Sequence, residues 1–274
     1  MRVAVAQVAA STEPADNLEL VRQWVRRAAD AAAGLVVFPE ATMASFARRS
    51  TEVAEPLDGE FAGGVRTVAA EAGITVVVGL FTPGAAAGDR PRARNTTLVV
   101  GPHGEATYDK IHLFDAWGFE ESRHVEAGST PVVTDAGGVR LGLATCYDVR
   151  FPELFKHLAR QGAQAIVVPA SWANGPGKAA QWQALCVARA LDSTCFVVGA
   201  GQADPASVGV QVESAAPTGV GHSLVVGPLG DVLARAGEAP ELLFADLDIS
   251  GLDAARDRLP VLANSRFGLV PPTG

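Results

Sequence analysis

The chain has 274 residues, of which 48% are hydrophobic and 19% charged, and its formal net charge at pH 7 is −8. These proportions are typical of a globular protein with a full hydrophobic core and exclude a disordered chain. The acidic balance argues against non-specific nucleic-acid binding, which needs clustered Lys and Arg. The one short basic cluster, at 90–94, is interrupted by Pro and Ala, and we expect a solvated loop there.

The ends and the cysteines of the chain bear on its location. The N-terminus lacks the apolar core and cleavage site of a secretory signal, and no apolar run approaches the roughly 20 residues that span a bilayer. Three widely spaced cysteines do not make a disulfide framework. We therefore expect a cytoplasmic protein with no membrane or nucleic-acid partner. It should form one domain over 1–270, followed by a short tail at 271–274.

In the first part of the chain, short apolar strands alternate with helices. Apolar residues at helical spacing predict a helix over 17–32, which Gly34 should end. A second helix is expected over 61–72. Gly101-Pro-His-Gly104 has the composition of a hairpin turn. The strands predicted here are 3–8, 35–38, 74–80, 95–100 and 106–110.

The second part of the chain continues this alternation. Helices are expected over 154–162 and 179–191, and the predicted strands are 139–145, 165–169, 194–200, 222–226, 232–236 and 242–249. Helices that alternate with apolar strands, interrupted by two hairpins, predict an α/β sandwich of mixed sheets. The segments 3–40 and 139–169 share the order strand, helix, strand, which is a weak internal repeat.

Three chemically active side chains follow directly on apolar strands: Glu40, Lys110 and Cys146. Ligands of α/β proteins usually bind beyond the carboxyl ends of strands. Each residue alone is more often a buried thiol or a solvated loop residue. Together they form a complete set, because a carboxylate can move a proton, a lysine can hold an oxyanion and a thiol can attack a carbonyl. A Cys–His pair is less favoured, and His112 and His222 are expected to make structural hydrogen bonds.

Three segments carry a resemblance to a known family. In chain order they are 37–40 (Val-Phe-Pro-Glu), 108–114 (Tyr-Asp-Lys-Ile-His-Leu-Phe) and 144–153 (Ala-Thr-Cys-Tyr-Asp-Val-Arg-Phe-Pro-Glu). They resemble the signature segments of the nitrilase, or carbon–nitrogen hydrolase, superfamily, and the likeness extends over about 3–269. The resemblance implies an α/β fold that forms a single-domain, four-layer α-β-β-α sandwich of the nitrilase type.

The resemblance also implies roles for individual residues. Glu40 is the expected general base and acid, Lys110 the oxyanion holder and Cys146 the nucleophile of a Glu–Lys–Cys triad. The backbone N–H of Tyr147 is the expected second oxyanion donor. The family has a second glutamate, for which Glu121 fits the pattern better than its neighbour Glu120. No cofactor or metal is implied, and the sequence has neither a zinc-spaced Cys/His cluster nor a dinucleotide-binding motif.

The residues after Cys146 are similar to those of the Nit-type amidases, the branch that includes ω-amidase and deaminated-glutathione amidase. This similarity implies hydrolysis of a small linear amide through a cysteine thioester, releasing ammonia and a carboxylic acid. An ω-amide of a keto acid or deaminated glutathione would be the substrate. The family also implies a homodimer or a larger homo-oligomer. The open alternatives are a nitrilase or N-carbamoyl amino acid hydrolase with the same triad, and a non-catalytic binding or scaffold member.

Four side chains are candidates for substrate contacts. Phe114, Trp117 and Trp172 would wall the pocket, although core or interface packing explains them equally well. Arg189 would meet a substrate carboxylate, with an internal salt bridge as the competing interpretation. The segments 171–178 and 208–221 depart from the related sequences near the expected mouth of the pocket, which leaves the identity of the amide open.

Overall fold

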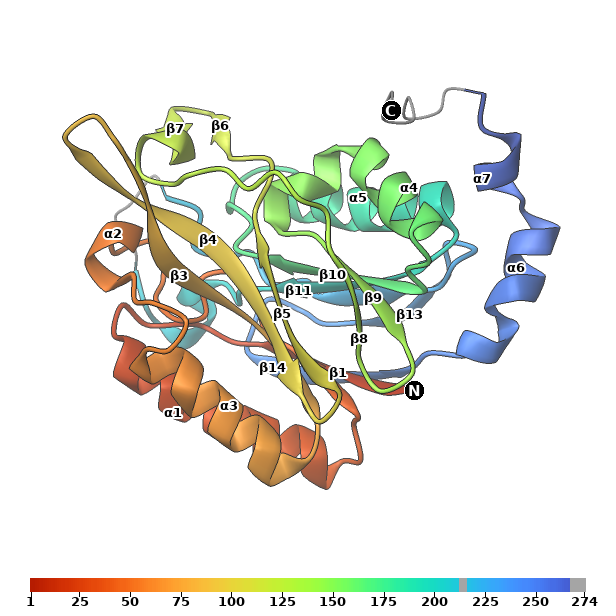
Figure 1. Ribbon diagram of the computed structural model, residues 1–274, viewed down its shortest axis with the longest axis horizontal. Helices are drawn as coiled ribbons and strands as arrows, with labels where there is room; N and C mark the ends of the chain where they lie inside the picture. The colour runs from red at the N-terminus through yellow and green to blue at the C-terminus, as the bar shows by residue number, and fades with distance from the viewer. Residues whose placement is uncertain (212–215, 267–274) are drawn as a thin grey trace.

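The computed structural model describes residues 1–211 and 216–266. Two six-stranded sheets pack face to face, and helices cover both outer faces (Figure 1). This arrangement confirms the predicted four-layer sandwich. The expected tail at 271–274 lies outside the described residues, as does 212–215 within the unusual loop at 208–221.

The first sheet has the strand order β14-β1-β2-β3-β4-β5. Its central strands β1 to β3 are parallel, while β4, β5 and β14 pair antiparallel with their neighbours. The strands are β1 (Arg2–Gln7), β2 (Leu35–Val37), β3 (Thr75–Ala87), β4 (Arg90–Gly101), β5 (Gly104–Asp109) and β14 (Glu241–Asp246). Helices α1 (Pro14–Asp30) and α3 (Glu60–Ala72) cover its outer face (Figure 1).

The second sheet repeats this plan with the order β13-β12-β11-β10-β9-β8. The parallel strands are now β9 to β11, and β8, β12 and β13 are antiparallel to their neighbours. The strands are β8 (Val133–Asp135), β9 (Arg140–Leu143), β10 (Ala165–Ala170), β11 (Phe196–Gly201), β12 (Leu224–Val226) and β13 (Val232–Arg235). Helices α4 (Pro152–Arg160) and α5 (Lys178–Ser193) cover it. The weak repeat in the sequence thus corresponds to β1-α1-β2 and β9-α4-β10.

The smaller elements lie at the edges of the sandwich. They are α2 (Ser50–Val53), the hairpin β6 (Asp115–Ala116) and β7 (Phe119–Glu120), and the C-terminal helices α6 (Leu252–Arg258) and α7 (Val261–Asn264). Short 3-10 helices occur at Glu121–Arg123, Cys146–Arg150, Pro205–Val208 and Ile249–Gly251. Among the described residues, no helix has both the length and the apolar character needed to cross a membrane.

Alternating side chains build the core on both faces of each sheet. In β1, Val3 and Val5 pack into the layer between the two sheets, whereas Ala4 and Ala6 pack towards α1 and α3. Successive side chains of a strand point to opposite faces, so a strand buried on both sides is apolar throughout. This explains why the central strands are recognisable as short apolar runs in the sequence.

Two local expectations from the sequence were wrong. Helix α1 ends at Asp30, before Gly34, because Ala32 takes a left-handed φ of 58° and the Ala33 N–H bonds to the carbonyl of Ala28. The basic cluster at 90–94 is not a loop but the beginning of β4, which pairs with β3. A strand can form there because the backbone pairing is made with a partner strand, and the arginine side chains remain at least partly exposed.

The chain after β2 crosses β3 at very short range. A Cβ atom on Gly79 would lie 2.8 Å from the Cα of Glu40 and 2.9 Å from the carbonyl oxygen of Pro39. The Met43 N–H also bonds to the Gly79 carbonyl at 3.1 Å. The position of Glu40 therefore depends on a glycine in the neighbouring strand.

We predict that Gly79→Ala lowers the free energy of unfolding by about 1–3 kcal/mol, because backbone atoms at this contact cannot yield. The matched control is Gly63→Ala in α3, where no heavy atom lies within 4 Å of the added Cβ. There, removing a helical glycine should raise stability by about 0.5–1 kcal/mol. Urea denaturation of both variants measures the difference, and equal effects would contradict the role given to Gly79.

Candidate active site

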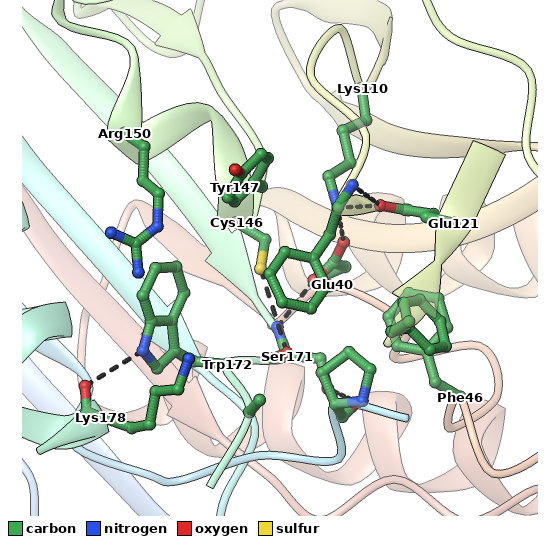
Figure 2. Close-up of a pocket in the computed structure, with 14 residues that line it drawn as sticks. Glu40, Phe46, Lys110, Glu121, Cys146, Tyr147, Arg150, Ser171, Trp172 and Lys178 are labelled. Atoms are coloured by element: carbon green, nitrogen blue, oxygen red, sulfur yellow. Dashed lines mark hydrogen bonds and ion pairs between the residues drawn. The ribbon is translucent and has the colours of Figure 1, made fainter. Parts of the chain in front are cut away.

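Polar residues from both sheets meet at one edge of the sandwich. Glu40 follows β2, Cys146 lies just beyond β9 and Ser171 follows β10, all of them parallel strands of their sheets. Lys110 follows β5. This strand runs in the same direction as β2 and β3, because β4 pairs antiparallel with both β3 and β5. The strand ends therefore bring these side chains together around one cavity (Figure 2).

The ammonium group of Lys110 lies between two buried carboxylates. Its Nζ is 2.9 Å from Oε1 of Glu40 and 2.8 Å from Oε2 of Glu121. The amide of Asn95 donates to both carboxylates, at 2.7 and 3.0 Å. The Phe114 N–H donates to Glu121 at 2.7 Å. A buried charge is tolerated when it is paired and hydrogen-bonded, and each of these three side chains meets that condition.

This arrangement brings Glu121, and not Glu120, to the lysine. Glu120 is exposed and pairs with Arg123 at 3.1 Å. Burial alone would lower the pKa of Lys110, but the carboxylates of Glu121 and Glu40 outweigh burial and raise it well above its usual value. The lysine is therefore a fixed cation at neutral pH, and it can stabilise a negative oxygen that develops beside it.

The second carboxylate oxygen of Glu40 faces the other sheet. It accepts the Ser171 N–H at 2.8 Å, and the Glu40 carbonyl accepts the side-chain amide of Gln202 at 3.0 Å. Sequence reasoning missed Asn95, Ser171 and Gln202. Ser171 carried a usable signal, because it is a polar residue just beyond the predicted strand at 165–169. Asn95 and Gln202 had none, since their contacts come from segments distant in the chain.

Cys146 stands at a sharp turn between β9 and the 3-10 helix Cys146–Arg150. Its φ is 47°, a left-handed conformation that costs energy for a residue with a side chain. The Sγ atom is buried and lies 4.0 Å from the Ser171 carbonyl. The N–H of Tyr147 belongs to the first turn of this short helix, where amides have no helical acceptor. The turn thus presents a thiol and an N–H donor together.

The surroundings of the thiol favour its protonated form. Burial and then the charge of Glu40 raise the pKa of Cys146 well above its usual value, and the cation of Lys110 only partly opposes them. A thiol in this state can act as a nucleophile only if a base takes its proton. Glu40 is the carboxylate that interacts directly with it.

Asp148 joins the turn to the first sheet. One of its oxygens accepts from the Tyr108 hydroxyl at 2.7 Å and from the Thr145 N–H at 2.8 Å. The other accepts from the backbone N–H of His112 at 3.0 Å and lies 2.7 Å from its Nδ1. Tyr108 and His112 flank Lys110 in the chain. Asp148 therefore holds the lysine segment and the cysteine turn in a fixed relation, and His112 makes the structural hydrogen bond expected of it.

The cavity over Cys146 is aromatic with a charged group at each end (Figure 2). Phe114 and Trp172 line it, and Phe46, Phe119 and Tyr147 complete its aromatic wall. Two cations also line it, Arg150 and Lys178, which sequence reasoning did not select. Arg150 lies in the segment that follows Cys146, and Lys178 ends the segment at 171–178 that departs from related sequences.

The structure does not bring the other two candidates to the cavity wall. Trp117 is 78% exposed, and its ring packs against the Lys178 ammonium, 4.0 Å from the ring centroid. Arg189 is buried in α5 and pairs with Asp192 at 3.1 Å, which is the internal salt bridge of the competing interpretation. The sequence predicted correctly that Arg189 lies on a helix. Which way its side chain points depends on how that helix packs, and this the sequence did not reveal. Across residues 1–211 and 216–266, no three His, Cys, Asp or Glu side chains are grouped to hold a metal ion.

Comparison with known proteins agrees with this geometry. The carbon–nitrogen hydrolase model matches residues 2–257. This chain belongs to the carbon–nitrogen hydrolase family. A hydrolase of Mycobacterium tuberculosis H37Rv is 55% identical over 270 residues, which cover 96% of this chain and 95% of the relative. The deaminated glutathione amidase of Escherichia coli O157:H7 is 36% identical over 279 residues, or 99% of each chain.

A solved relative carries a covalent group at its cysteine. The amidase of Nesterenkonia sp. AN1 has been solved with the acetamide moiety of fluoroacetamide on its active-site cysteine. It matches this carbon–nitrogen hydrolase with a TM-score of 0.75 and 28% identity, covering 97% of this chain and 94% of that chain. The family membership confirms the resemblance drawn from the three sequence segments and makes the protein a hydrolase of carbon–nitrogen bonds.

We predict that Asp148→Asn lowers the free energy of unfolding by about 2–3 kcal/mol, because either orientation of the amide turns its NH₂ towards a backbone N–H donor, that of Thr145 or that of His112. Tyr108→Phe removes only the hydroxyl donor to Asp148 and should cost about 1–2 kcal/mol. Chemical denaturation compares the two variants. A smaller loss for Asp148→Asn than for Tyr108→Phe would contradict the central position of Asp148.

A second prediction concerns the thiol itself. In Glu40→Gln the negative charge beside the thiolate is removed, so the pKa of Cys146 should fall and its alkylation should begin at lower pH. The rate of iodoacetamide labelling at Cys146, followed by mass spectrometry from pH 6 to 10, measures this shift. Cys186 and Cys195 serve as internal controls, because both are buried away from the site and should label only on unfolding. A pH profile that stays in place or moves upward would refute the assignment of Glu40 as the main charged neighbour.

Proposed function

We propose that the protein hydrolyses a small linear amide of an anionic acid through a thioester on Cys146, releasing a carboxylic acid and ammonia, or an amine where the amide nitrogen is substituted. The observation that carries this proposal is the placement of Cys146 between two different groups of charges. On one side are Lys110, Glu40 and Glu121, and on the other are the cations that line the cavity. The names of the amidase relatives support the hydrolysis of amides.

The first half of the reaction follows from the contacts at Cys146. As Sγ forms a bond to the amide carbonyl carbon, Glu40 takes the thiol proton. The carbonyl oxygen becomes negative and is held by the Lys110 ammonium and the Tyr147 N–H. Glu40 then gives the proton to the amide nitrogen, the carbon–nitrogen bond breaks, and ammonia leaves. The acyl group remains on Sγ as a thioester.

The second half uses the same carboxylate. Glu40 takes a proton from water, whose oxygen attacks the thioester carbon, and the proton returns to Sγ as the carboxylic acid leaves. Glu121 transfers no proton in either half of the reaction. Its carboxylate holds the Lys110 ammonium in place before the negative charge develops on the carbonyl oxygen, so little reorganisation is needed.

Arg150 is the cation best suited to the acid end of the substrate. Its guanidinium stacks 5.0 Å from the centroid of Trp172 and is held by Gln181 at 3.0 Å. A planar guanidinium fixed in this way can bind a carboxylate with two parallel hydrogen bonds. The candidates are therefore an ω-amide of a keto acid or deaminated glutathione. We further propose a cytoplasmic location and a homodimer or larger assembly, for which light scattering after size exclusion is the direct measurement of oligomeric state.

The expected result of an ammonia-release assay is turnover of α-ketoglutaramate that disappears in Cys146→Ala. The panel also contains deaminated glutathione, assayed by release of its amine, simple aliphatic amides, a nitrile and an N-carbamoyl amino acid. Circular dichroism of Cys146→Ala checks that the variant is folded. Turnover of the nitrile alone, or of the N-carbamoyl amino acid alone, would contradict the amidase proposal and favour the corresponding alternative hydrolase. No turnover of any compound, with Cys146 still selectively alkylated, would contradict the substrate class proposed.

A further inference from the structure

Lys178 is a buried cation on the cavity wall. It is the first residue of α5, and only 7% of the residue is exposed. Its backbone carbonyl accepts the indole N–H of Trp172 at 3.1 Å. Figure 2 shows Trp172 between Arg150 and Lys178, on the side of Cys146 away from Phe46 and Glu121. One aromatic ring thus separates two cations at the same end of the cavity.

These two cations have no carboxylate partner in the part of the chain that the structure describes. No Asp or Glu oxygen lies within 4 Å of either Arg150 or Lys178 there, whereas Lys110 at the other end has two such partners. Burial and then the charge of Arg150 lower the pKa of Lys178. Two nearby, partly desolvated positive charges are unfavourable for an empty protein and become favourable when an anion enters the cavity that both of them line.

We propose that Lys178 is a specificity-determining residue that, with Arg150, selects amides whose acyl chain ends in an anion and rejects those that carry an ammonium group there. This inference rests on the proposed amidase function and refines its substrate class. A keto-acid amide offers a carboxylate and a neutral neighbouring oxygen to the two cations. An amino-acid amide such as glutamine would place an ammonium beside the same cations, and like charges repel strongly in a cavity of low dielectric.

Trp117 is the positioning residue for Lys178. Its ring lies against the ammonium, 4.0 Å away, and a cation–π contact of this kind restrains a flexible lysine side chain. The residue occupies the turn between β6 and β7 with a φ of 61°, which is unfavourable for a tryptophan. An exposed aromatic ring in a strained turn is explained if its function is to hold Lys178 at the mouth of the cavity.

A protection experiment tests this inference without turnover. Glutarate and pentanoate, acids of equal chain length, compete with iodoacetamide for Cys146 in the wild type and in Lys178→Met. Glutarate carries the second carboxylate that Lys178 should bind, so its half-protecting concentration should rise roughly 10- to 100-fold in Lys178→Met. The half-protecting concentration of pentanoate should rise far less. Lys156→Met removes an equal charge outside the cavity and should leave the half-protecting concentrations of both acids at their wild-type values.

Turnover then tests selectivity and the role of Trp117. In Lys178→Met, the ratio of kcat/KM for α-ketoglutaramate to that for glutamine should fall. In Trp117→Leu, KM for α-ketoglutaramate should rise while kcat is largely kept, which a general loss of folding would not produce. Equal losses for glutarate and pentanoate, or the same changes in Lys156→Met, would overturn the inference. The protection experiment measures binding and needs no catalysis. Its result therefore does not depend on whether the proposed function is correct.

Discussion

The ion pairs of Lys110 with Glu40 and Glu121 are the interaction on which the rest of the site depends. Three charged side chains from the segments after β2, β5 and β7 are all removed from water, and burial of any one of them without its partners would be costly. Their stability comes from mutual pairing and from donors such as Asn95 and the Ser171 N–H. The fold must therefore assemble before any of these groups can be buried, and the assembled group keeps one cation and two carboxylates in fixed positions.

The two sheets contribute to this group in complementary ways. The first sheet supplies Glu40 and Lys110, and the second supplies Cys146 and the backbone N–H of Ser171 that donates to Glu40. Asp148 spans the interface, because it receives hydrogen bonds from Tyr108 and His112 of one half and from Thr145 of the other. Buried apolar residues, many of them valines, fill the layer between the sheets, so the core and Asp148 together hold the two halves in position.

The charges of the cavity explain how an amide could be oriented over Cys146. Lys110, Glu40 and Glu121 together carry a net negative charge at one end, and Arg150 and Lys178 carry positive charge at the other. An acyl chain with an anionic end would align with this field before any specific contact forms. The aromatic side chains between the two ends give the cavity apolar walls, and charge interactions are stronger beside apolar walls than in bulk water.

The sequence by itself determined an α/β class, the central strands and the residues at their ends. Each of these follows from local information: apolar runs predict buried strands, and chemical types at strand ends identify Glu40, Lys110 and Cys146. The family resemblance added the four-layer order and Glu121, which the structure places beside the lysine. Only the tertiary structure decided that Asn95, Ser171 and Gln202 support the glutamates, that Arg150 and Lys178 line the cavity in place of Arg189, and that 90–94 belongs to a strand. These contacts join segments far apart in the chain, and their partners are set by strand register and packing, which no local pattern of residues records.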